Sequence, residues 1–358
     1  MKNYTSYDLI EWGKPFEKSQ HALPEPTLSE VLIRVTAAGL CHSDLHVQKG
    51  YMDLGEEGRL TFAERGAQLP MTFGHEIAGI VEAIGDKVKN VSIGQQVIVF
   101  PWIGCGDCLA CNEDRESDCS AMRIIGLKQK GGFATHCLIE NEKFLVNIDG
   151  LDAADVVPHA CSGITVYNAL EKIGSLRDGE WLAVMGCGGL GLNAIAIASA
   201  MGFGNIIGID IDNSKLDAAR QMGASKTLNS KSANAVADLQ KFAESRLMAV
   251  IDTFGGESTG QLAVRALAKS GQYLLVGQAG GDFKMPQVWL PQKAMMVRGS
   301  HVGNSPQLRK LIDMVRAGKI KQMPIERRQL SEINQAVEDL EQGRVTGRIV
   351  FQPDQGKL

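Results

Sequence analysis

Short, mainly apolar runs of strand length alternate with turn residues in the first part of the chain, a pattern typical of β-strands. Turn residues such as Pro101 end these runs. The strand-length runs occupy residues 31–36, 79–84 and 96–100. Irregular all-β sequence of this kind predicts a small barrel-like domain that extends to about residue 160.

Residues 47–70 follow neither the strand period nor the helix period. Charged residues and glycines separate scattered apolar side chains, which are Tyr51, Met52, Leu54, Leu60 and Phe62. We expect this segment to be a long excursion from the domain that carries a short helix.

The middle of the chain changes to apolar runs of strand length separated by helix-like segments. The runs lie at residues 181–185, 205–209, 248–252 and 272–276, and the helical segments lie at 191–201, 214–222 and 258–267. This alternation predicts a parallel sheet with crossover helices, which residues 296–300 would close. Helices at 306–317 and 330–342 and a strand at 347–351 follow, and we expect this tail to return to the first domain.

Length and composition fit an ordinary globular protein with two domains and a large core. The apolar fraction is 44% and the charged fraction 22%. A net charge of −4 argues against nucleic acid or an anionic membrane as a partner. The chain contains no stretch of about 18 consecutive apolar residues, so we expect no membrane span.

Four cysteines in a loop-like segment, Cys105, Cys108, Cys111 and Cys119, have the spacing C-x2-C-x2-C-x7-C. Thiolates this close in sequence can surround one tetrahedral zinc ion. Because four thiolates close the coordination shell, this zinc is expected to brace a lobe of the protein and not to catalyse. The alternative is a set of disulfides. The polar N-terminus lacks an export signal, which favours metal binding and a cytoplasmic location.

A glycine-rich turn follows the apolar run at 181–185 and opens a helix, with the sequence G-x-G-x-x-G. Its residues are Gly186, Cys187, Gly188, Gly189, Leu190 and Gly191, and Asp210 ends the next strand. This context predicts dinucleotide binding, with the diphosphate at the helix N-terminus. Asp210 would bind the adenosine ribose hydroxyls and repel a 2′-phosphate, so NAD is expected over NADP. A glycine-rich turn without a ligand is the alternative.

A second zinc site is indicated by Cys41 in Gly-Leu-Cys-His-Ser-Asp, His75 in Gly-His-Glu, and Cys161. A catalytic zinc takes about three protein ligands and keeps one position open. These residues are far apart in the sequence, so spacing alone does not prove that they meet.

At this point the chain resembles the zinc-containing medium-chain alcohol dehydrogenases. The Cys41 and His75 motifs, the cysteine tetrad, Cys161 and the glycine fingerprint occur in that family's order, over nearly the whole chain. Within the family the chain looks most like the tetrameric, NAD-dependent branch of archaea and bacteria. This rests on the long insertion before residues 69–76 and on residues 100–102 and 161–165.

The resemblance implies an α/β protein of two domains. A GroES-like β-rich catalytic domain with the structural zinc lobe would comprise residues 1–162 and 301–358. A Rossmann domain with a doubly wound parallel sheet, residues 163–300, would bind NAD. A homotetramer is expected, with a dimer as the alternative, paired through the apolar edge within residues 276–301.

The resemblance also implies roles for individual residues. Cys41, His75 and Cys161 match the catalytic zinc ligands, Glu76 a carboxylate that can approach the zinc, and Asp44 the carboxylate that orients the ligand histidine. Ser43 and His46 match a proton relay. The matching cofactor residues are His42 and Arg348 at the diphosphate, Thr165 and Leu190 at the nicotinamide, and Lys215 at the ribose, beside Gly186, Gly188, Gly189, Gly191 and Asp210.

The implied activity is hydride transfer between a primary or secondary alcohol and NAD, which interconverts the alcohol with an aldehyde or ketone. Two zinc ions per chain would be bound. The alternatives are a dehydrogenase specialised for a polyol, an amino-alcohol or an aromatic alcohol, a zinc-free enoyl or quinone reductase of the same fold, and a non-catalytic zinc-braced protein.

The remaining histidines and cysteines have ordinary interpretations. His21, His136 and His301 are interpreted as structural or solvent-facing, and Cys137 and Cys187 as small core residues. His159 and Trp102 are candidates for lining the site, with a structural role as the alternative.

Overall fold

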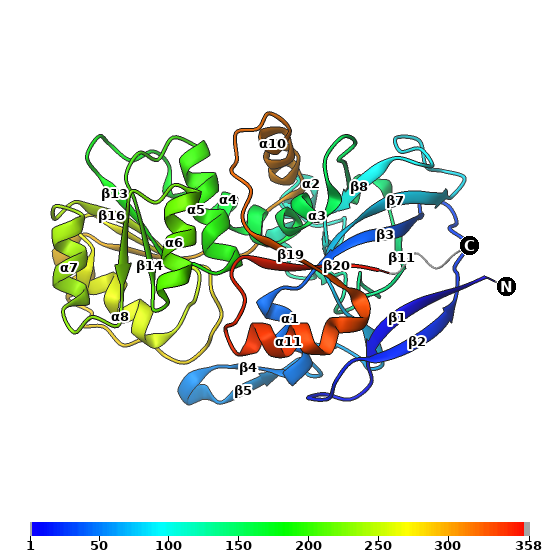
Figure 1. Cartoon of the computed structure of the whole chain (residues 1–358), viewed down its shortest axis with the longest axis horizontal. Coiled ribbons are helices and arrows are strands. Elements are labelled where there is room, and N and C mark those ends of the chain that lie inside the picture. Colours follow the sequence, from blue (N-terminus) through cyan, green and yellow to red (C-terminus); the bar gives the residue numbers. More distant parts are fainter. Residues whose placement is uncertain (1, 354–358) are drawn as a thin grey trace.

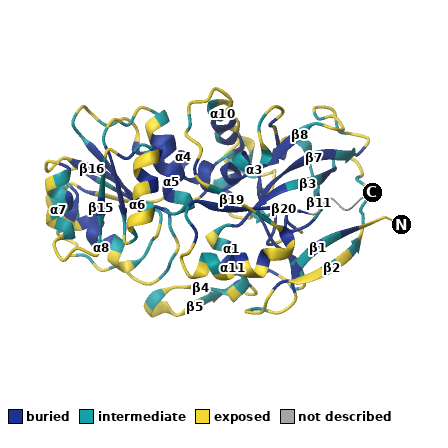
Figure 2. Cartoon of the chain, in the orientation of Figure 1, coloured by how far each residue is buried: buried dark blue, intermediate teal, exposed yellow. Residues whose placement is uncertain are grey.

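The computed structural model describes residues 2–353, which form two lobes along the long axis of the molecule (Figure 1). One lobe is built on a mostly antiparallel sheet and the other on a parallel sheet. Figure 2 shows that buried residues concentrate in the strands, while helix faces turned away from the sheets are exposed.

The mostly antiparallel sheet has seven strands in the order β12-β8-β7-β3-β20-β19, with β11 paired to β3. The strands are β3 (Val31–Gly39), β7 (Glu76–Ile84), β8 (Gln96–Val99), β11 (His136–Ile139), β12 (Leu145–Asn147), β19 (Ile325–Gln329) and β20 (Arg348–Gln352). The three strand predictions in this region are confirmed. β3 is buried along most of its length, because neighbours cover it on both sides.

A second, three-stranded sheet lies beside it in the order β2-β1-β6, formed by β1 (Asn3–Leu9), β2 (Glu17–Ala22) and β6 (Met71–Thr72). Aromatic rings fill the core of this lobe. The ring of Phe133 contacts Phe16 and Phe351 edge to face at centroid distances of 5.9 and 5.6 Å. Phe133 is fully buried, so this contact joins the two ends of the chain through one core.

The parallel sheet has six strands in the order β15-β14-β13-β16-β17-β18. The strands are β13 (Trp181–Met185), β14 (Ile206–Asp210), β15 (Lys226–Asn229), β16 (Leu247–Asp252), β17 (Gln272–Leu275) and β18 (Met296–Gly299). The strand order reverses direction at β13, as it does in a doubly wound Rossmann sheet. The predicted parallel sheet and its closing strand are confirmed.

Helices cover both faces of this sheet. They are α4 (Ser162–Ile173), α5 (Gly189–Ala200), α6 (Asn213–Met222), α7 (Ala235–Phe242) and α8 (Glu257–Ala266). In β13, Leu182 and Val184 pack with α4, α5 and α6, whereas Ala183 and Met185 pack with α7 and α8. The alternation along the strand therefore separates two cores, and every residue of β13 is buried.

The tail returns to the antiparallel lobe, as predicted. After α10 (Ser305–Arg316), the helix α11 (Ile333–Glu341) buries Ile333, Ala336 and Val337 against that lobe. Strand β20 then pairs with β3, with Val350 opposite Gly39. The first residue of β20 thereby lies beside the end of β3.

Residues 47–70 contain a hairpin, β4 (Tyr51–Asp53) paired with β5 (Arg59–Thr61), after α1 (His42–Lys49). The only helix wholly within the segment is the 3-10 turn η1 (Gly55–Glu57), so the expected short helix is one turn at the hairpin tip. Both hairpin faces are largely accessible, which explains why the sequence shows no alternation. At the tip the backbone N–H of Glu56 donates to Asp282 at 2.7 Å, and the hairpin thus contacts the parallel-sheet lobe.

Short elements connect these parts: β9 (Trp102–Ile103), α2 (Leu109–Asn112), η2 (Glu116–Asp118), β10 (Arg123–Ile124), η3 (Glu142–Phe144), α3 (Ala153–Val156), η4 (Val157–Ala160), α9 (Trp289–Lys293) and η5 (Leu330–Glu332). Within residues 2–353, no helix has both the length and the apolar character that crossing a membrane requires.

Candidate active site and metal centres

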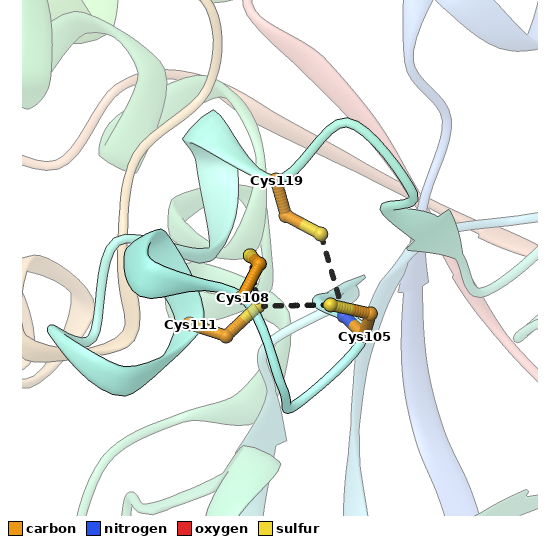
Figure 3. Close-up of side chains that lie close together, drawn as sticks. All are labelled: Cys105, Cys108, Cys111 and Cys119. Carbon is orange, nitrogen blue, oxygen red and sulfur yellow. Dashed lines mark hydrogen bonds between the residues drawn. The ribbon is translucent and has the colours of Figure 1, made fainter.

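The four tetrad cysteines lie together on one loop that includes the short helix α2 (Figure 3). Their sulfur atoms all lie within 4.8 Å of one another, and the Cys105–Cys111 and Cys108–Cys111 distances are 3.9 and 3.5 Å. A tetrahedral zinc with bonds of about 2.3 Å holds sulfurs about 3.8 Å apart. The donor set and its spacing therefore fit one zinc ion with a closed shell.

A second group of possible metal ligands is formed by Cys41, His75 and Cys161, whose ligand atoms lie within 4.8 Å of one another. The sulfurs of Cys41 and Cys161 are 3.9 Å apart, too far for a disulfide, which requires about 2.05 Å, and suitable for one shared zinc. Three donors leave one coordination position open, as a catalytic zinc requires.

Sheet pairing brings these three residues together. Gly39 at the end of β3 pairs with Glu76 at the start of β7, so Cys41 and His75 both lie just beyond that end of the sheet. Cys161 caps the start of α4, and the preceding turn η4 packs against β7. The structure thus unites the ligands that sequence spacing alone left unproved.

Asp44 fixes the orientation of two of these residues. One of its carboxylate oxygens lies 3.3 Å from Nδ1 of His75, and the other accepts the backbone N–H of Cys41 at 2.9 Å. Burial opposes the charged imidazole, but the neighbouring Asp44 raises the pKa of His75 well above its usual value. With Nδ1 held by Asp44, Nε2 is the nitrogen that faces the cluster, and it lies 3.5 Å from the hydroxyl of Ser43.

The sulfurs of Cys41 and Cys161 are in an environment that favours a thiolate. The hydrogen bond from Cys161 lowers the pKa of the Cys41 thiol well below its usual value, against the opposing effect of burial, and Arg348 adds to the lowering. The same hydrogen bond raises the pKa of Cys161. A thiolate stabilised in this way is a suitable zinc ligand.

Glu76 and Arg348 form a fully buried ion pair next to the cluster, with Nη2 of Arg348 2.8 Å from Oε1 of Glu76. Among the described residues, Oε2 of Glu76 has no hydrogen-bond partner. Burial raises the pKa of Glu76 to about 8, although Arg348 opposes this. The second oxygen is thus a buried acceptor without a protein donor, beside Cys41.

The glycine-rich turn has the geometry of a diphosphate-binding turn. Gly186 has a φ of +84°, and a Cβ on Gly191 would lie 1.7 Å from the carbonyl oxygen of Gly186, so both positions require glycine. A Cβ on Gly188 would meet nothing within 4 Å, which leaves open space in front of the α5 N-terminus. That space and the free N–H groups of the helix fit a diphosphate.

Asp210 ends β14 next to this turn. Its carboxylate accepts the backbone N–H of Cys187 at 2.7 Å, of Ile211 at 2.8 Å and of Asp212 at 3.0 Å. The backbone therefore holds the carboxylate at the edge of the glycine turn, where the ribose of a dinucleotide would lie.

Basic residues from both lobes meet at the turn. A Cβ on Gly189 would lie 3.5 Å from the guanidinium carbon of Arg348, which also binds Glu76. Burial lowers the pKa of His42, and the charges of Arg348, Lys49 and Lys215 lower it further. Arg348, His42 and Lys215 therefore lie near one another around the place where the diphosphate and ribose fit.

Trp102 forms a wall beside the metal cluster. Its ring lies 5.6 Å from the ring of His75 and 6.1 Å from that of His301, and its indole N–H donates to the carbonyl of Ala160 at 3.3 Å. His301 was interpreted from sequence as structural or solvent-facing, and its contact with Trp102 was not predicted. Thr165 is buried on α4, one turn after Cys161, and Leu190 is half-buried in the first turn of α5.

Most of the other histidines and cysteines make contacts of a structural kind. His21 contacts Asp8 at 2.9 Å and His136 contacts Glu82 at 3.2 Å, as expected for structural histidines. The buried thiols of Cys137 and Cys187 donate to backbone carbonyls. Burial lowers the pKa of His159 to about 4.

Family models and solved structures agree with this geometry. Residues 27–150 match the "Alcohol dehydrogenase GroES-like domain" and residues 189–317 match the "Zinc-binding dehydrogenase" family. The crystal structure of the alcohol dehydrogenase from Aeropyrum pernix superposes with a TM-score of 0.89 at 28% identity, over 98% of this chain and all of that one.

Sequence similarity to curated relatives extends over almost the full length of the chain. The NAD-dependent alcohol dehydrogenase of Sulfurisphaera tokodaii is 37% identical and that of Saccharolobus solfataricus 36% identical, each over 348 residues, or 96% of this chain and 99% of the relative. Two zinc-compatible clusters, one of them near a dinucleotide turn, on a GroES-like lobe joined to a Rossmann lobe, are what such a relationship requires. This chain belongs to the zinc-dependent alcohol dehydrogenase family of the medium-chain dehydrogenases.

Proposed function

We propose that this protein is an NAD-dependent zinc alcohol dehydrogenase. It transfers a hydride between a primary or secondary alcohol and NAD, and so interconverts alcohols with aldehydes or ketones. One observation supports this proposal most directly. Cys41, His75 and Cys161 lie close enough to bind one zinc ion with one coordination position left open, and a turn suited to a dinucleotide lies next to them.

Cys41, His75 and Cys161 would hold the catalytic zinc, and Cys105, Cys108, Cys111 and Cys119 the structural zinc. A zinc ion in the three-ligand site supplies Lewis acidity that makes a bound alcohol easier to deprotonate. Asp44 keeps His75 oriented as a ligand. Glu76, whose Oε2 has no hydrogen-bond partner among the described residues, would offer a further carboxylate donor beside the zinc ligands.

The proton of the alcohol would leave through Ser43 and His46. The hydroxyl of Ser43 lies 3.5 Å from Nε2 of His75, so it borders the metal site. Burial lowers the pKa of His46, with a further effect from His42, which favours the neutral imidazole, the form that can accept a proton.

NAD would be held by residues of both lobes, and its nicotinamide accepts the hydride. Asp210 would bind the ribose with Lys215 nearby, and Thr165 and Leu190 would pack on the nicotinamide. Gly186, Gly188, Gly189 and Gly191 would admit the diphosphate, with His42 and Arg348 near its charge. In this arrangement residues 2–162 and 301–353 would form the catalytic domain and residues 163–300 the cofactor domain, while residue 1 and residues 354–358 of the expected bounds lie outside the described residues.

The reaction is tested by following nicotinamide absorbance during NAD⁺ reduction with linear, branched, cyclic, benzylic and polyhydric alcohols. We expect activity on some of them, lost after treatment with a zinc chelator and restored by zinc. Zinc analysis is expected to give two ions per chain. Chelator-resistant activity in protein with one zinc or none would contradict the proposal and favour a zinc-free reductase.

Asp210→Gly is expected to relax the preference for NAD over NADP. The wild-type carboxylate would accept hydrogen bonds from ribose hydroxyls and repel a 2′-phosphate, and the variant removes both effects. We expect the ratio of kcat/KM for NAD to that for NADP to fall at least about tenfold, equivalent to roughly 1.4 kcal/mol. Asp212→Ser is a matched control, because that carboxylate caps α6 through the Ser214 N–H. An unchanged ratio in the Asp210 variant would refute its role.

A homotetramer, with a dimer as the alternative, is proposed from the branch that the chain resembles. The edge strand β18 supports pairing of the parallel-sheet lobes, because Met296 and Val297 remain 49% and 40% exposed there. Light scattering coupled to size-exclusion chromatography measures the mass. We also propose a cytoplasmic location, where a reducing environment would keep the eight cysteines as thiols or zinc ligands.

A further inference from the structure

The rings of Trp102 and His301 form a wall that extends away from the metal cluster. Trp102 contacts His75 on one side and His301 on the other, at centroid distances of 5.6 and 6.1 Å. His301 is exposed to solvent, yet burial of part of its ring lowers its pKa. The ring of His301 therefore lies on the far side of Trp102 from the metal ligand.

The turn that carries Arg65 packs against the same wall. Phe62 is buried in a small cluster with Leu127, and Ile124 packs against that cluster. Ile124 of β10 pairs directly with Trp102 of β9. The turn is thus fixed beside the strand pair that presents Trp102, and Arg65 stands at its exposed end.

Arg65 brings an uncompensated positive charge to this place. Its guanidinium lies over the ring of Phe62 and contacts the sulfur of Met52 at 3.4 Å. Among the described residues, no carboxylate lies within ion-pair distance of it. The neighbouring Glu64 instead accepts hydrogen bonds from Thr61, at the start of the turn.

The charges that act on His301 are both positive. After burial, Arg65 and then Lys172 lower the pKa of the imidazole, which places both cations near it. Lys172 donates a hydrogen bond to Ser300 at 3.0 Å. His301 makes no side-chain hydrogen bond to another described residue, so its ring nitrogens are available to a ligand.

We propose that Arg65 and His301 form an oxyanion-binding end of the substrate pocket, which selects alcohols that carry a carboxylate or a phosphate far from the hydroxyl. This inference rests on the proposed function. The planar guanidinium offers paired donors that match both groups, and it lacks a competing protein carboxylate. Trp102, which contacts both His75 and His301, would lie between the two ends of such a substrate.

The experiment compares ω-hydroxycarboxylates and hydroxyalkyl phosphates with diols and simple alcohols of matched length. We expect wild-type kcat/KM to be at least about tenfold higher for one of the anionic series, since a hydrogen bond to a charged group contributes about 1.5–3 kcal/mol. Arg65→Gln is expected to lower the ratio of anionic to neutral kcat/KM by about tenfold or more. The two anionic series show whether carboxylate or phosphate is preferred.

Arg59→Gln is the matched control. Arg59 lies on β5, in the hairpin that precedes the Arg65 turn, and its guanidinium stacks on Tyr51 at 4.0 Å instead of on the rings of Trp102 and His301. We expect this variant to keep the wild-type ratio. The anion subsite would be overturned if the wild-type enzyme preferred the neutral alcohols and Arg65→Gln had the same ratio of anionic to neutral kcat/KM. That result would leave the alcohol dehydrogenase function intact.

Equilibrium binding provides a readout that does not depend on turnover. Calorimetry with an unreactive alkanoate and alkyl phosphate is expected to show that Arg65→Gln binds the favoured anion about tenfold more weakly than the wild-type holoenzyme. Equal affinities would count against the subsite. If no alcohol were oxidised, the proposed function would fail, and this measurement would still decide whether Arg65 binds an anion.

Discussion

Cys41→Ala and His75→Ala are expected to abolish most alcohol oxidation while leaving NADH binding in place. Each variant removes one of three side chains whose ligand atoms lie within 4.8 Å of one another. Loss of a residue that orients a metal ligand, as Asp44 orients His75, typically lowers metal affinity or activity roughly 10- to 100-fold. Loss of a ligand itself is therefore expected to lower kcat/KM by more than about 100-fold.

The measurements are steady-state kinetics, zinc content and the dissociation constant of NADH by fluorescence. We expect each variant to hold one zinc instead of two, because the tetrad lies on a separate loop. Cys137→Ala is the control, since Cys137 is a buried thiol outside both clusters that donates only to a backbone carbonyl. Either ligand variant keeping most of its activity would show that the assignment of the catalytic zinc is wrong.

Cys119→Ala is expected to lower stability or assembly without removing the chemistry. Of the residues between 104 and 120, only Glu116 and Cys119 are buried, so this loop has almost no apolar core of its own. Its main anchor elsewhere is the hydroxyl of Ser117, which donates to Asn304 at 2.7 Å. The zinc ion must therefore supply most of the free energy that orders the loop.

Zinc binding is worth about 10–16 kcal/mol in small zinc-dependent peptides. If a quarter of that is lost, Tm is expected to fall by roughly 3–5 °C, because the unfolding entropy of a chain of this length is large. Differential scanning calorimetry, zinc content and light scattering measure the effect, again against Cys137→Ala. Wild-type Tm and mass in a variant with one zinc fewer would contradict a bracing role for this site.

Local patterns predicted most of the fold. The strands from Val31 and from Trp181 were recognisable as short apolar runs, because strands covered on both faces exclude most polar side chains. The excursion at 47–70 was harder, because its hairpin is largely accessible on both faces and therefore carries no alternation. The hairpin contact between Glu56 and Asp282 joins segments that are distant in the sequence, so no local sequence pattern predicts it.

The cysteine tetrad and the glycine turn were determined by the sequence itself. Cys105 to Cys119 must be close in space because few residues separate them, and Gly186 to Gly191 encode a backbone that side chains would block. For these two sites the structure adds distances, but the chemistry follows from spacing alone.

The catalytic cluster was decided by tertiary structure. Cys41 and His75 meet because Gly39 of β3 pairs with Glu76 of β7, and Arg348 reaches Glu76 because β20 pairs with β3. The residue types and the family resemblance supplied these candidates, but strand register is set by long-range hydrogen bonds and by which faces are buried. For the same reason Arg65 and His301, which no motif marks, emerged as neighbours only once the chain had folded.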